Sequence, residues 1–397
     1  MEHIYQLATI YIALAVTSAI IAYHLKISIA LIEITIGAIA ANIALKYAGI
    51  NILEPNTEWV KVLASFAAIL LTFLAGTELD PKTLKDKRKE SLIIGAIGFL
   101  APFIGGYLVS KYIVGWNNDA SLLVGIALST TSMAVVYAVM IETGLNSTEF
   151  GKGILASCFL NDIGTVLALG FVFSPFNLKT VIFILVSAVV IFIFPKATDY
   201  LTNIYGNRTA AIRAKFVMLV LLFLGFVAVR SDVEPVLPAY IAGMVLAEFS
   251  IRNKNWILRM RTLTIGFLTP FYFLRAGSFV SFKSLISAPL IFIFLFLSKV
   301  LSKIFGLYPF ISIFRKEKNE RMYYTLLMST GLTFGTISAL FGYTHGIIDQ
   351  TQYSLIVMVV IASAVIPTAI ATIFFEPKHL MPTKKHITEI KDELIEE

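Results

Sequence analysis

Four ionisable residues stand out deep within long apolar segments of the sequence, where charged side chains are rare: Glu33, Asp162, Arg275 and Lys299. A charge at the centre of a membrane helix costs about 2.5–3.5 kcal/mol on insertion scales, so such a residue is a candidate for function. Asp162 lies mid-segment beside the amide of Asn161. Because burial disfavours an ionised carboxylate, Asp162 is a candidate site for a proton or a dehydrated cation. The alternative is a structural ion pair with Arg275 or Lys299.

The other charged candidates each have two interpretations. Lys299 lies too deep in its segment to reach the membrane interface, so it is either a structural charge partner or part of the site, whereas Lys303 is predicted to reach the interface. Arg275 either neutralises a nearby acid or extends to the interface. Glu33 and Glu78 lie nearer segment ends, which favours packing or interface roles over ligand binding.

Two runs of Ser, Thr and Gly lie inside apolar segments. The first is 127–133, with Thr130, Thr131 and Ser132, and the second is 329–338, with Ser329 and Thr330. Such runs allow a membrane helix to break and expose backbone groups to an ion. Interrupted segments at corresponding positions of two halves are typical of transporter binding sites. The alternative is close packing of small residues between helices.

The apolar segments that contain these residues have the composition and length of transmembrane helices. The chain has 397 residues, 57% hydrophobic and 14% charged, with a mean hydropathy of +0.82, whereas soluble domains carry roughly 25% charged residues. About 20 apolar residues in a helix are needed to cross a bilayer. Apolar segments that reach or approach this length predict about thirteen transmembrane helices in an all-α membrane protein: 4–23, 27–47, 60–79, 92–114, 120–141, 150–173, 178–194, 216–229, 235–249, 263–280, 287–308, 322–342 and 353–375.

Basic residues alternate between the predicted loops. One set of loops, with the C-terminal tail, carries 23 Lys and Arg residues, the opposite set carries six, and three lie within segments. The positive-inside rule then predicts an outside N-terminus and a cytoplasmic C-terminus. The net charge of +7 is therefore an orientation signal, and no nucleic-acid partner is expected. One cysteine, Cys158, excludes a disulfide framework and a Cys-cluster metal site.

The order of the segments suggests an internal repeat. If segments one to six and eight to thirteen form two halves joined by the seventh, the interrupted helix is the fifth of each half. Because each half has an even number of helices and a single helix links the halves, the second half must be inserted in the membrane in the opposite orientation to the first. The sequence therefore predicts two six-helix inverted repeats with crossing interrupted helices, an architecture of secondary transporters.

Several motifs carry a resemblance to a known family. They are the segment 73–80, the run 127–132, the pair Asn161 and Asp162, Lys299, and the segment 361–370 with Pro367. In this order the chain, to about residue 375, resembles the monovalent cation:proton antiporter superfamily, in its prokaryotic sodium/proton antiporter and Kef-like membrane-domain branch. The resemblance implies the sodium/proton antiporter fold.

The resemblance implies that Asp162 binds the transported cation and the proton alternately. Asn161, Thr130, Thr131 and Ser132 would complete the site, and Lys299 and Arg275 would serve as charge partners in the core. Further candidates are Glu78, Ser157, Ser329 and Thr330. The family also implies a homodimer in the lipid bilayer, in which a core bundle (about 92–173 and 287–375) moves against a dimerisation part (about 1–79 and 178–280). Residues 376–397 would form a short cytoplasmic tail.

We therefore expect a plasma-membrane antiporter that exchanges a monovalent cation, Na⁺ in first place, for H⁺. Asn161 replaces the first of two aspartates found in sodium-transporting members, which leaves the stoichiometry open. The alternatives are a K⁺/H⁺ antiporter or Kef-like K⁺ efflux transporter, a sodium-coupled symporter of organic anions, and a non-transporting scaffold. An intramembrane enzyme is disfavoured because Gly-x-Gly-Asp and His-Glu-x-x-His motifs are missing. No cofactor and no nucleotide-binding domain are expected.

Overall fold

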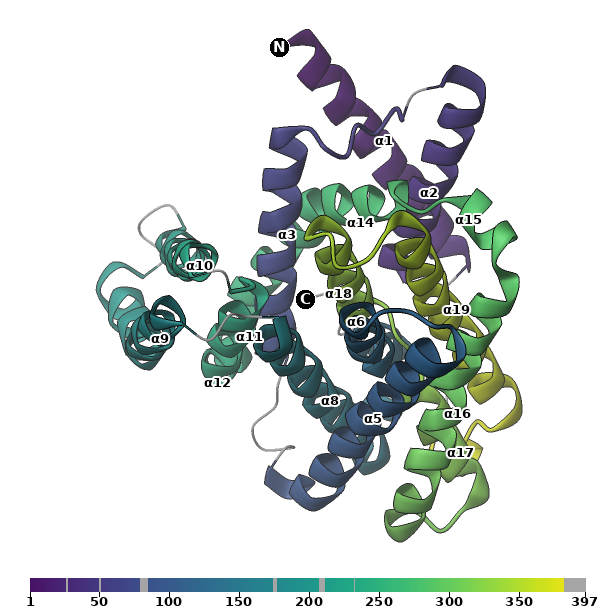
Figure 1. Cartoon of the computed structure of the whole chain (residues 1–397). Helices are drawn as coiled ribbons and strands as arrows, with labels where there is room; N and C mark the ends of the chain where they lie inside the picture. Colours follow the sequence, from purple (N-terminus) through teal and green to yellow (C-terminus); the bar gives the residue numbers. More distant parts are fainter. Residues whose placement is uncertain are drawn as a thin grey trace. The chain divides into compact units, whose positions relative to one another are not determined.

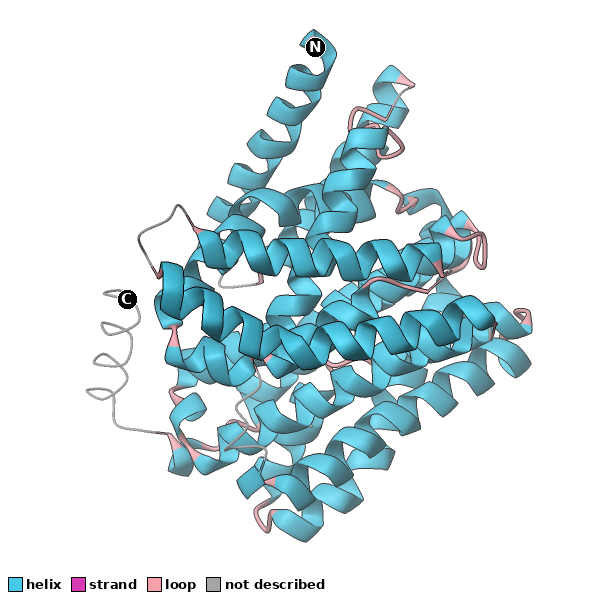
Figure 2. Ribbon diagram, turned by 90° about the vertical axis from the view of Figure 1, so that its left-hand side faces the viewer, coloured by secondary structure: helices cyan, strands magenta, loops and turns pink. Residues whose placement is uncertain are grey.

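A computed structural model describes residues 1–25, 28–49, 51–78, 85–173, 177–206, 211–231 and 233–381. Over these ranges the secondary structure is helical, without strands (Figures 1 and 2). The helices of the first part are α1 (Glu2–Leu25), α2 (Ile29–Ala48), α3 (Glu58–Thr77), α5 (Arg88–Leu108, continued by a π-helical turn, Val109–Ile113), α6 (Asn118–Ser129), α7 (Met133–Thr143) and α8 (Glu149–Phe173).

The second part continues with helices only. These are α9 (Leu178–Tyr205), α10 (Ile212–Arg230), α11 (Val236–Val245), α12 (Ala247–Arg252), α13 (Lys254–Leu263), α14 (Thr269–Ser278, preceded by a π-helical turn, Thr264–Leu268), α15 (Phe282–Ser287), α16 (Pro289–Phe314), α17 (Lys318–Met328), α18 (Thr333–Thr344) and α19 (Gln350–Phe374). Most predicted membrane segments fall within one helix or within an interrupted pair. The segment 235–249 instead takes in α11 and the start of α12, and α9 continues to Tyr205, beyond the predicted end at residue 194.

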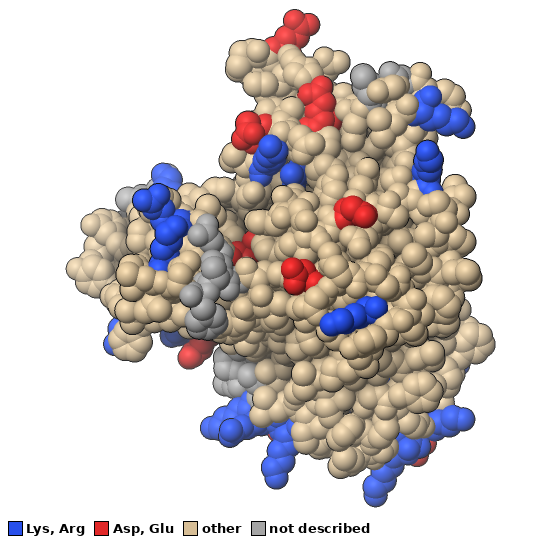
Figure 3. All heavy atoms as spheres, in the orientation of Figure 1, with Lys and Arg blue, Asp and Glu red and all other residues tan. Residues whose placement is uncertain are grey.

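Ten spans within the described ranges are long and apolar enough to cross a membrane. One of the ten, Lys318–Thr344, contains the interrupted pair α17 and α18, and two shorter apolar helices are α6 and α11. The all-α membrane class is therefore confirmed, whereas the count of thirteen crossings stays a prediction. Most of the surface visible in Figure 3 is uncharged, as expected for a chain surrounded by lipid.

Side-chain caps begin several of these helices. The Asn117 side chain accepts a hydrogen bond from the backbone N–H of Ala120 at the start of α6. Asp349 and Gln352 form a capping box at the start of α19. Such caps satisfy backbone donors that have no partner within the helix. The ends of the helices are thus set by local sequence.

Contacts divide the chain into two compact units. The first comprises Met1–Asn56, Thr83–Thr165 and Phe273–Glu397, and the second comprises Thr57–Lys82 and Val166–Tyr272. The first unit holds both interrupted pairs, α6 with α7 and α17 with α18, together with α5, α16 and most of α8. A division by contacts is not a division by motion, so the predicted core and dimerisation parts remain a prediction.

Glycines bring α5 close to α8 within the first unit. A methyl group added at Gly95 would lie 2.6 Å from Leu160 Cβ, and one added at Gly98 would lie 3.4 Å from Asn161 Nδ2. These two glycines are three residues apart and so share one face of α5. The face of α8 that carries Asn161 is therefore packed directly against the backbone of α5.

Candidate ion-binding site

The uninterrupted helix α8 positions Asp162 and Asn161. Asp162 is 2% exposed and Asn161 is fully buried. Thr165, one turn further along, donates from Oγ1 to the Asn161 carbonyl at 3.3 Å and lies 3.5 Å from Ser129 Oγ, at the end of α6. The polar face of α8 thus meets the end of the first interrupted helix.

The first break separates α6 from α7 at residues 130–132, which are all buried. Helix α6 ends where Thr130 adopts an extended backbone, with φ −61° and ψ 148°. A helix end frees its last carbonyl groups, and the Thr130 carbonyl accepts a hydrogen bond from Lys299 Nζ at 3.2 Å. The Ser and Thr run therefore interrupts the helix as predicted.

The second break lies between α17 and α18 and contacts the first. Thr131 Oγ1 donates to the Met328 carbonyl at 2.9 Å, and the backbone N–H of Ser132 donates to Thr330 Oγ1 at 3.3 Å. Ser329 Oγ donates within its own helix to the Thr325 carbonyl. The prediction of two crossing interrupted helices is confirmed.

Two lysines of α16 reach this crossing. The buried face of α16 recurs every four residues and includes Leu295, Lys299, Lys303, Leu307 and Ile311. Both lysines are fully buried, and Lys303 Nζ donates to Thr131 Oγ1 at 2.8 Å. The prediction that Lys303 reaches the interface is wrong, because a spacing of four residues places it on the same face as Lys299. That spacing was visible in the sequence.

Gly331 makes room for the Lys299 ammonium group. A methyl group added at Gly331 would collide with Lys299 Nζ and would lie 2.9 Å from Thr130 Oγ1. The second break is therefore packed directly against the lysine that holds the end of α6. A side chain at this position would displace the ammonium group from the Thr130 carbonyl.

The site combines one carboxylate with two ammonium groups in a buried setting. The charges of Lys303 and Asp162 lie close enough to interact. Lys299 faces the C-terminal end of α6, where the helix dipole places partial negative charge. Carboxylate, hydroxyl and carbonyl oxygens are the ligands that hard cations prefer. Over the ranges that the structure describes, no group of three or more His, Cys, Asp or Glu side chains could hold a metal ion.

Three of the predicted residues have their contacts away from the crossing. Arg275 donates from Nε to the Pro55 carbonyl at 2.7 Å and lies over the Phe279 ring. Glu78, in the second unit, accepts from Arg261 Nη2 at 2.8 Å. A role for Arg275 or Glu78 in ion binding stays a prediction.

Ser157 is the third predicted residue with contacts away from the crossing, and it contacts Tyr324, a residue that the sequence analysis did not single out. Its Oγ atom lies 2.7 Å from the hydroxyl oxygen of Tyr324 on α17. Glu90 and Arg315, also missed as a pair, form an ion pair with distances of 2.7 and 3.1 Å. These partners lie 167 and 225 residues apart in the chain, so no local pattern could have paired them.

Glu33 on α2 is a buried carboxylate away from the crossing of the two breaks. The side chain is fully buried, and within the described residues neither carboxylate oxygen has a hydrogen-bond partner. The sequence favoured a packing or interface role for Glu33 over ligand binding, and a buried position is compatible with packing. The packing of α2 against α14, where Gly37 lies against the Leu274 backbone, accounts for a buried position on α2.

Comparison with protein families gives one match over nearly the whole chain. The family model described as "Sodium/hydrogen exchanger, transmembrane" matches residues 11–376. The chain is 31% identical over 241 residues to the probable Na(+)/H(+) antiporter 3 of Methanocaldococcus jannaschii, covering 58% of this chain and 61% of that protein. It is 25% identical over 357 residues to the Na(+)/H(+) antiporter of Enterococcus hirae, covering 86% and 92% respectively.

Two further comparisons concern a different ion and the fold. The chain is 27% identical over 274 residues to the chloroplastic K(+) efflux antiporter 2 of Arabidopsis thaliana, covering 64% of this chain and 23% of that protein. The solved structure of the sodium proton antiporter MjNhaP1 from Methanocaldococcus jannaschii at pH 8 superposes with a TM-score of 0.68 at 15% identity, covering 93% of this chain and 99% of that one. This likeness shows a shared fold.

Proposed function

Because this chain belongs to the sodium/hydrogen exchanger family, we propose that it exchanges a monovalent cation, Na⁺ in first place, for H⁺, and that both compete for Asp162. The observation that carries the proposal is the burial of Asp162 beside two crossing helix breaks and two buried lysines. The family match and the two sodium/proton antiporter relatives support cation and proton as the exchanged pair.

Competition for one carboxylate explains why transport would be coupled. An ionised carboxylate is strongly disfavoured in a low-dielectric barrier. Either a proton or a cation neutralises Asp162, so the loaded site crosses between the two faces and the empty, ionised site does not. Because only a neutralised site crosses, the transporter would exchange one ion for the other and would not let either pass alone, whichever cation is carried.

The lysines would hold the broken helices in place during this cycle. Lys299 neutralises the end of α6 at the Thr130 carbonyl, and Lys303 donates to Thr131, which itself bonds to the Met328 carbonyl. Each contact joins α16 to a break, so α16 and the two interrupted helices would move together. We infer alternating access by a core bundle of about 92–173 and 287–375 that moves against the remaining helices.

The assembly and its orientation complete the proposal. We infer a homodimer in the plasma membrane, as the family resemblance implies. Its N-terminus would lie outside and its C-terminus in the cytoplasm, because the predicted loops of one side carry 23 basic residues and those of the other side carry six. The transported cation is the substrate, and Asp162 would bind it. By resemblance to the family, Asn161, Thr130, Thr131 and Ser132 would complete the binding site.

A K⁺/H⁺ antiporter is the second candidate. It is favoured by the similarity to a K(+) efflux antiporter. The two candidates differ in cation selectivity and share the site. Both therefore predict the same loss of function when Asp162 is neutralised.

Proteoliposomes that contain a pH-sensitive dye test the proposal. Addition of Na⁺, Li⁺ or K⁺ to the wild type is expected to drive proton movement for the preferred cation, and Asp162→Asn abolishes it. Asp119→Asn removes an exposed carboxylate from the first turn of α6 and serves as the matched control. Cation-driven proton flux that survives in Asp162→Asn would contradict the proposal. Repeating the assay with an imposed membrane potential determines the stoichiometry.

A further inference from the structure

A pair of buried hydroxyl groups lies one helical turn from Asn161. Ser157 Oγ and Tyr324 Oη are 2.7 Å apart, and both lie within hydrogen-bond distance of the Gly153 carbonyl, at 3.0 and 2.9 Å. Ser157 and Tyr324 are buried. The pair joins α8 to α17, the helix that leads into the second break.

These three contacts can be made in two ways. Each hydroxyl has one hydrogen to donate, so one hydroxyl donates to the other while the second donates to the Gly153 carbonyl. Exchanging these roles requires rotation of the two hydrogens and no movement of heavy atoms. A pair with two equivalent hydrogen arrangements can pass a proton in either direction.

The polar face of α8 extends the pair toward Asp162 at one end. Gly153, Ser157 and Asn161 recur every four residues and so line one face of α8. Within the described residues, neither Oδ1 nor Nδ2 of Asn161 has a hydrogen-bond partner. The amide therefore offers a donor and an acceptor to a bridging water between Ser157 and Asp162.

At its other end the pair lies near an ion pair at the rim of the bundle. A methyl group added at Gly153 would lie 3.3 Å from both Glu90 Oε1 and Arg315 Nη2. Glu90 also interacts electrostatically with Tyr324. The Glu90 side chain is buried and the Arg315 side chain is 16% exposed, so solvent reaches this end of the pair through Arg315.

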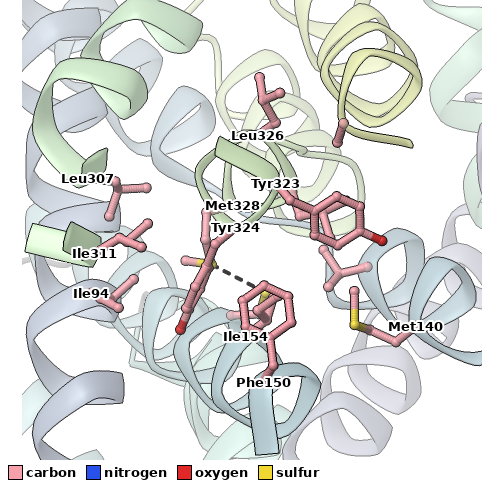
Figure 4. Close-up of a cluster of buried hydrophobic side chains, with 14 of the residues drawn as sticks. Ile94, Met140, Phe150, Ile154, Leu307, Ile311, Tyr323, Tyr324, Leu326 and Met328 are labelled. Atoms are coloured by element: carbon pink, nitrogen blue, oxygen red, sulfur yellow. Dashed lines mark hydrogen bonds between the residues drawn. The ribbon is translucent and has the colours of Figure 1, made fainter. Parts of the chain in front are cut away.

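Apolar side chains surround the ring of Tyr324. Figure 4 shows the Tyr324 ring between Ile94 and Ile154. The Phe150 ring packs edge-on against Tyr324 at a centroid distance of 5.9 Å. A hydrated cation needs several oxygen ligands or waters, which this apolar cluster does not provide, whereas a proton needs only the hydroxyl chain.

We propose that the Ser157 and Tyr324 hydroxyls relay protons between the Glu90 end of the bundle and Asp162, separately from the path of the cation. The Ser157 hydroxyl first rotates its hydrogen from the Gly153 carbonyl toward Asn161. A proton from solvent then joins Tyr324 Oη as the hydrogen of Tyr324 passes to Ser157 Oγ, and the hydrogen of Ser157 leaves toward the Asp162 carboxylate. Each hydroxyl ends with one hydrogen, and rotation resets the pair. The proposal rests on the proposed exchange at Asp162.

Two fluxes in proteoliposomes separate proton relay from cation binding. The first is exchange of radiolabelled Na⁺ for unlabelled Na⁺ at equal pH, which needs no proton. The second is Na⁺-driven proton movement. Tyr324→Phe is expected to lower the second flux by about tenfold or more, as for loss of a positioned proton-transfer group, and to leave the first within about twofold.

Neighbouring variants provide the controls. Tyr323→Phe removes a buried hydroxyl from the adjacent position of α17 and is expected to change neither flux. If Tyr324→Phe does not fold, Ser157→Ala replaces it: Ser157→Ala is expected to lower proton movement, and Ser157→Thr, which keeps the hydroxyl, is expected to restore it.

Three outcomes would overturn one proposal or the other. An equal fall of both fluxes in Tyr324→Phe would show that the pair only holds α8 against α17. Unchanged fluxes would show that protons take another route. If Asp162→Asn keeps the exchange of labelled Na⁺, the proposed ion site itself is wrong, whatever Tyr324→Phe does.

Discussion

Gly331 lies in the break between α17 and α18, where any side chain would meet the Lys299 ammonium group. Gly331→Ala is expected to push this ammonium group away from the Thr130 carbonyl, to which it now donates at 3.2 Å. Loss of a hydrogen bond to a charged group accounts for about 1.5–3 kcal/mol. Overpacking of the new methyl group adds about 1–3 kcal/mol. We therefore expect the free energy of unfolding to fall by about 2.5–6 kcal/mol.

A double-mutant cycle isolates the contact between the two residues. If Lys299 is the group displaced, Gly331→Ala should be much less harmful in a Lys299→Ala background, with a coupling energy of about 2–3 kcal/mol. Denaturant titration of the purified protein in micelles measures all four free energies. Gly266→Ala is the control, because a methyl group there has no neighbour within 4 Å, and it should change stability by less than about 0.5 kcal/mol.

Two results would refute this reasoning. Gly331→Ala with wild-type stability would mean that the second break does not pack against Lys299. Equal destabilisation by Gly331→Ala with and without the Lys299 side chain would mean that the methyl group meets other atoms, such as Thr130 Oγ1 at 2.9 Å.

Two further predictions concern charges outside the crossing. Burial raises the pKa of Glu234, in the segment before α11, to about 7 from 4.5. The folded state therefore binds the carboxyl proton of Glu234 more tightly than the unfolded state does. The free energy of unfolding is then expected to fall by up to about 3 kcal/mol as the pH rises from the lower to the higher of these two pKa values. Glu234→Gln should remove this dependence in thermal unfolding measured below and above that range, and a variant with an unchanged pH profile would contradict the assignment. Arg315→Gln leaves the Glu90 carboxylate buried without its partner and should lower the free energy of unfolding by about 3–5 kcal/mol. Adding Glu90→Gln should recover most of this loss; no recovery would mean that the two charges are not coupled.

The breaks in the interrupted helices were predictable because their cause is local. A run such as Thr130, Thr131 and Ser132 has side chains that compete for backbone hydrogen bonds, and α6 ends at this run in the structure. The apolar segments were predictable for a similar reason, since the bilayer thickness requires about 20 apolar residues per crossing. Lys303 could also have been placed from its spacing of four residues from Lys299.

The partners of these residues were not predictable. Tyr324 lies 167 residues from Ser157, and Arg315 lies 225 residues from Glu90. Both pairs depend on which helices are neighbours and on how each helix is rotated about its axis. Arg275 shows the same limit, because its hydrogen bond to the Pro55 carbonyl joins residues 220 apart in the chain.

The amino-acid sequence alone determined that the chain is a helical membrane protein with a buried carboxylate and two interrupted helices. Hydrophobic length and backbone competition are properties of short segments, so they can be read along the chain. Only the tertiary structure decided that Lys303 joins Thr131, that Thr131 meets Met328, and that a hydroxyl pair lies on the Asp162 helix. These contacts arise from packing between distant helices, where small residues such as Gly95 set how closely two helices approach.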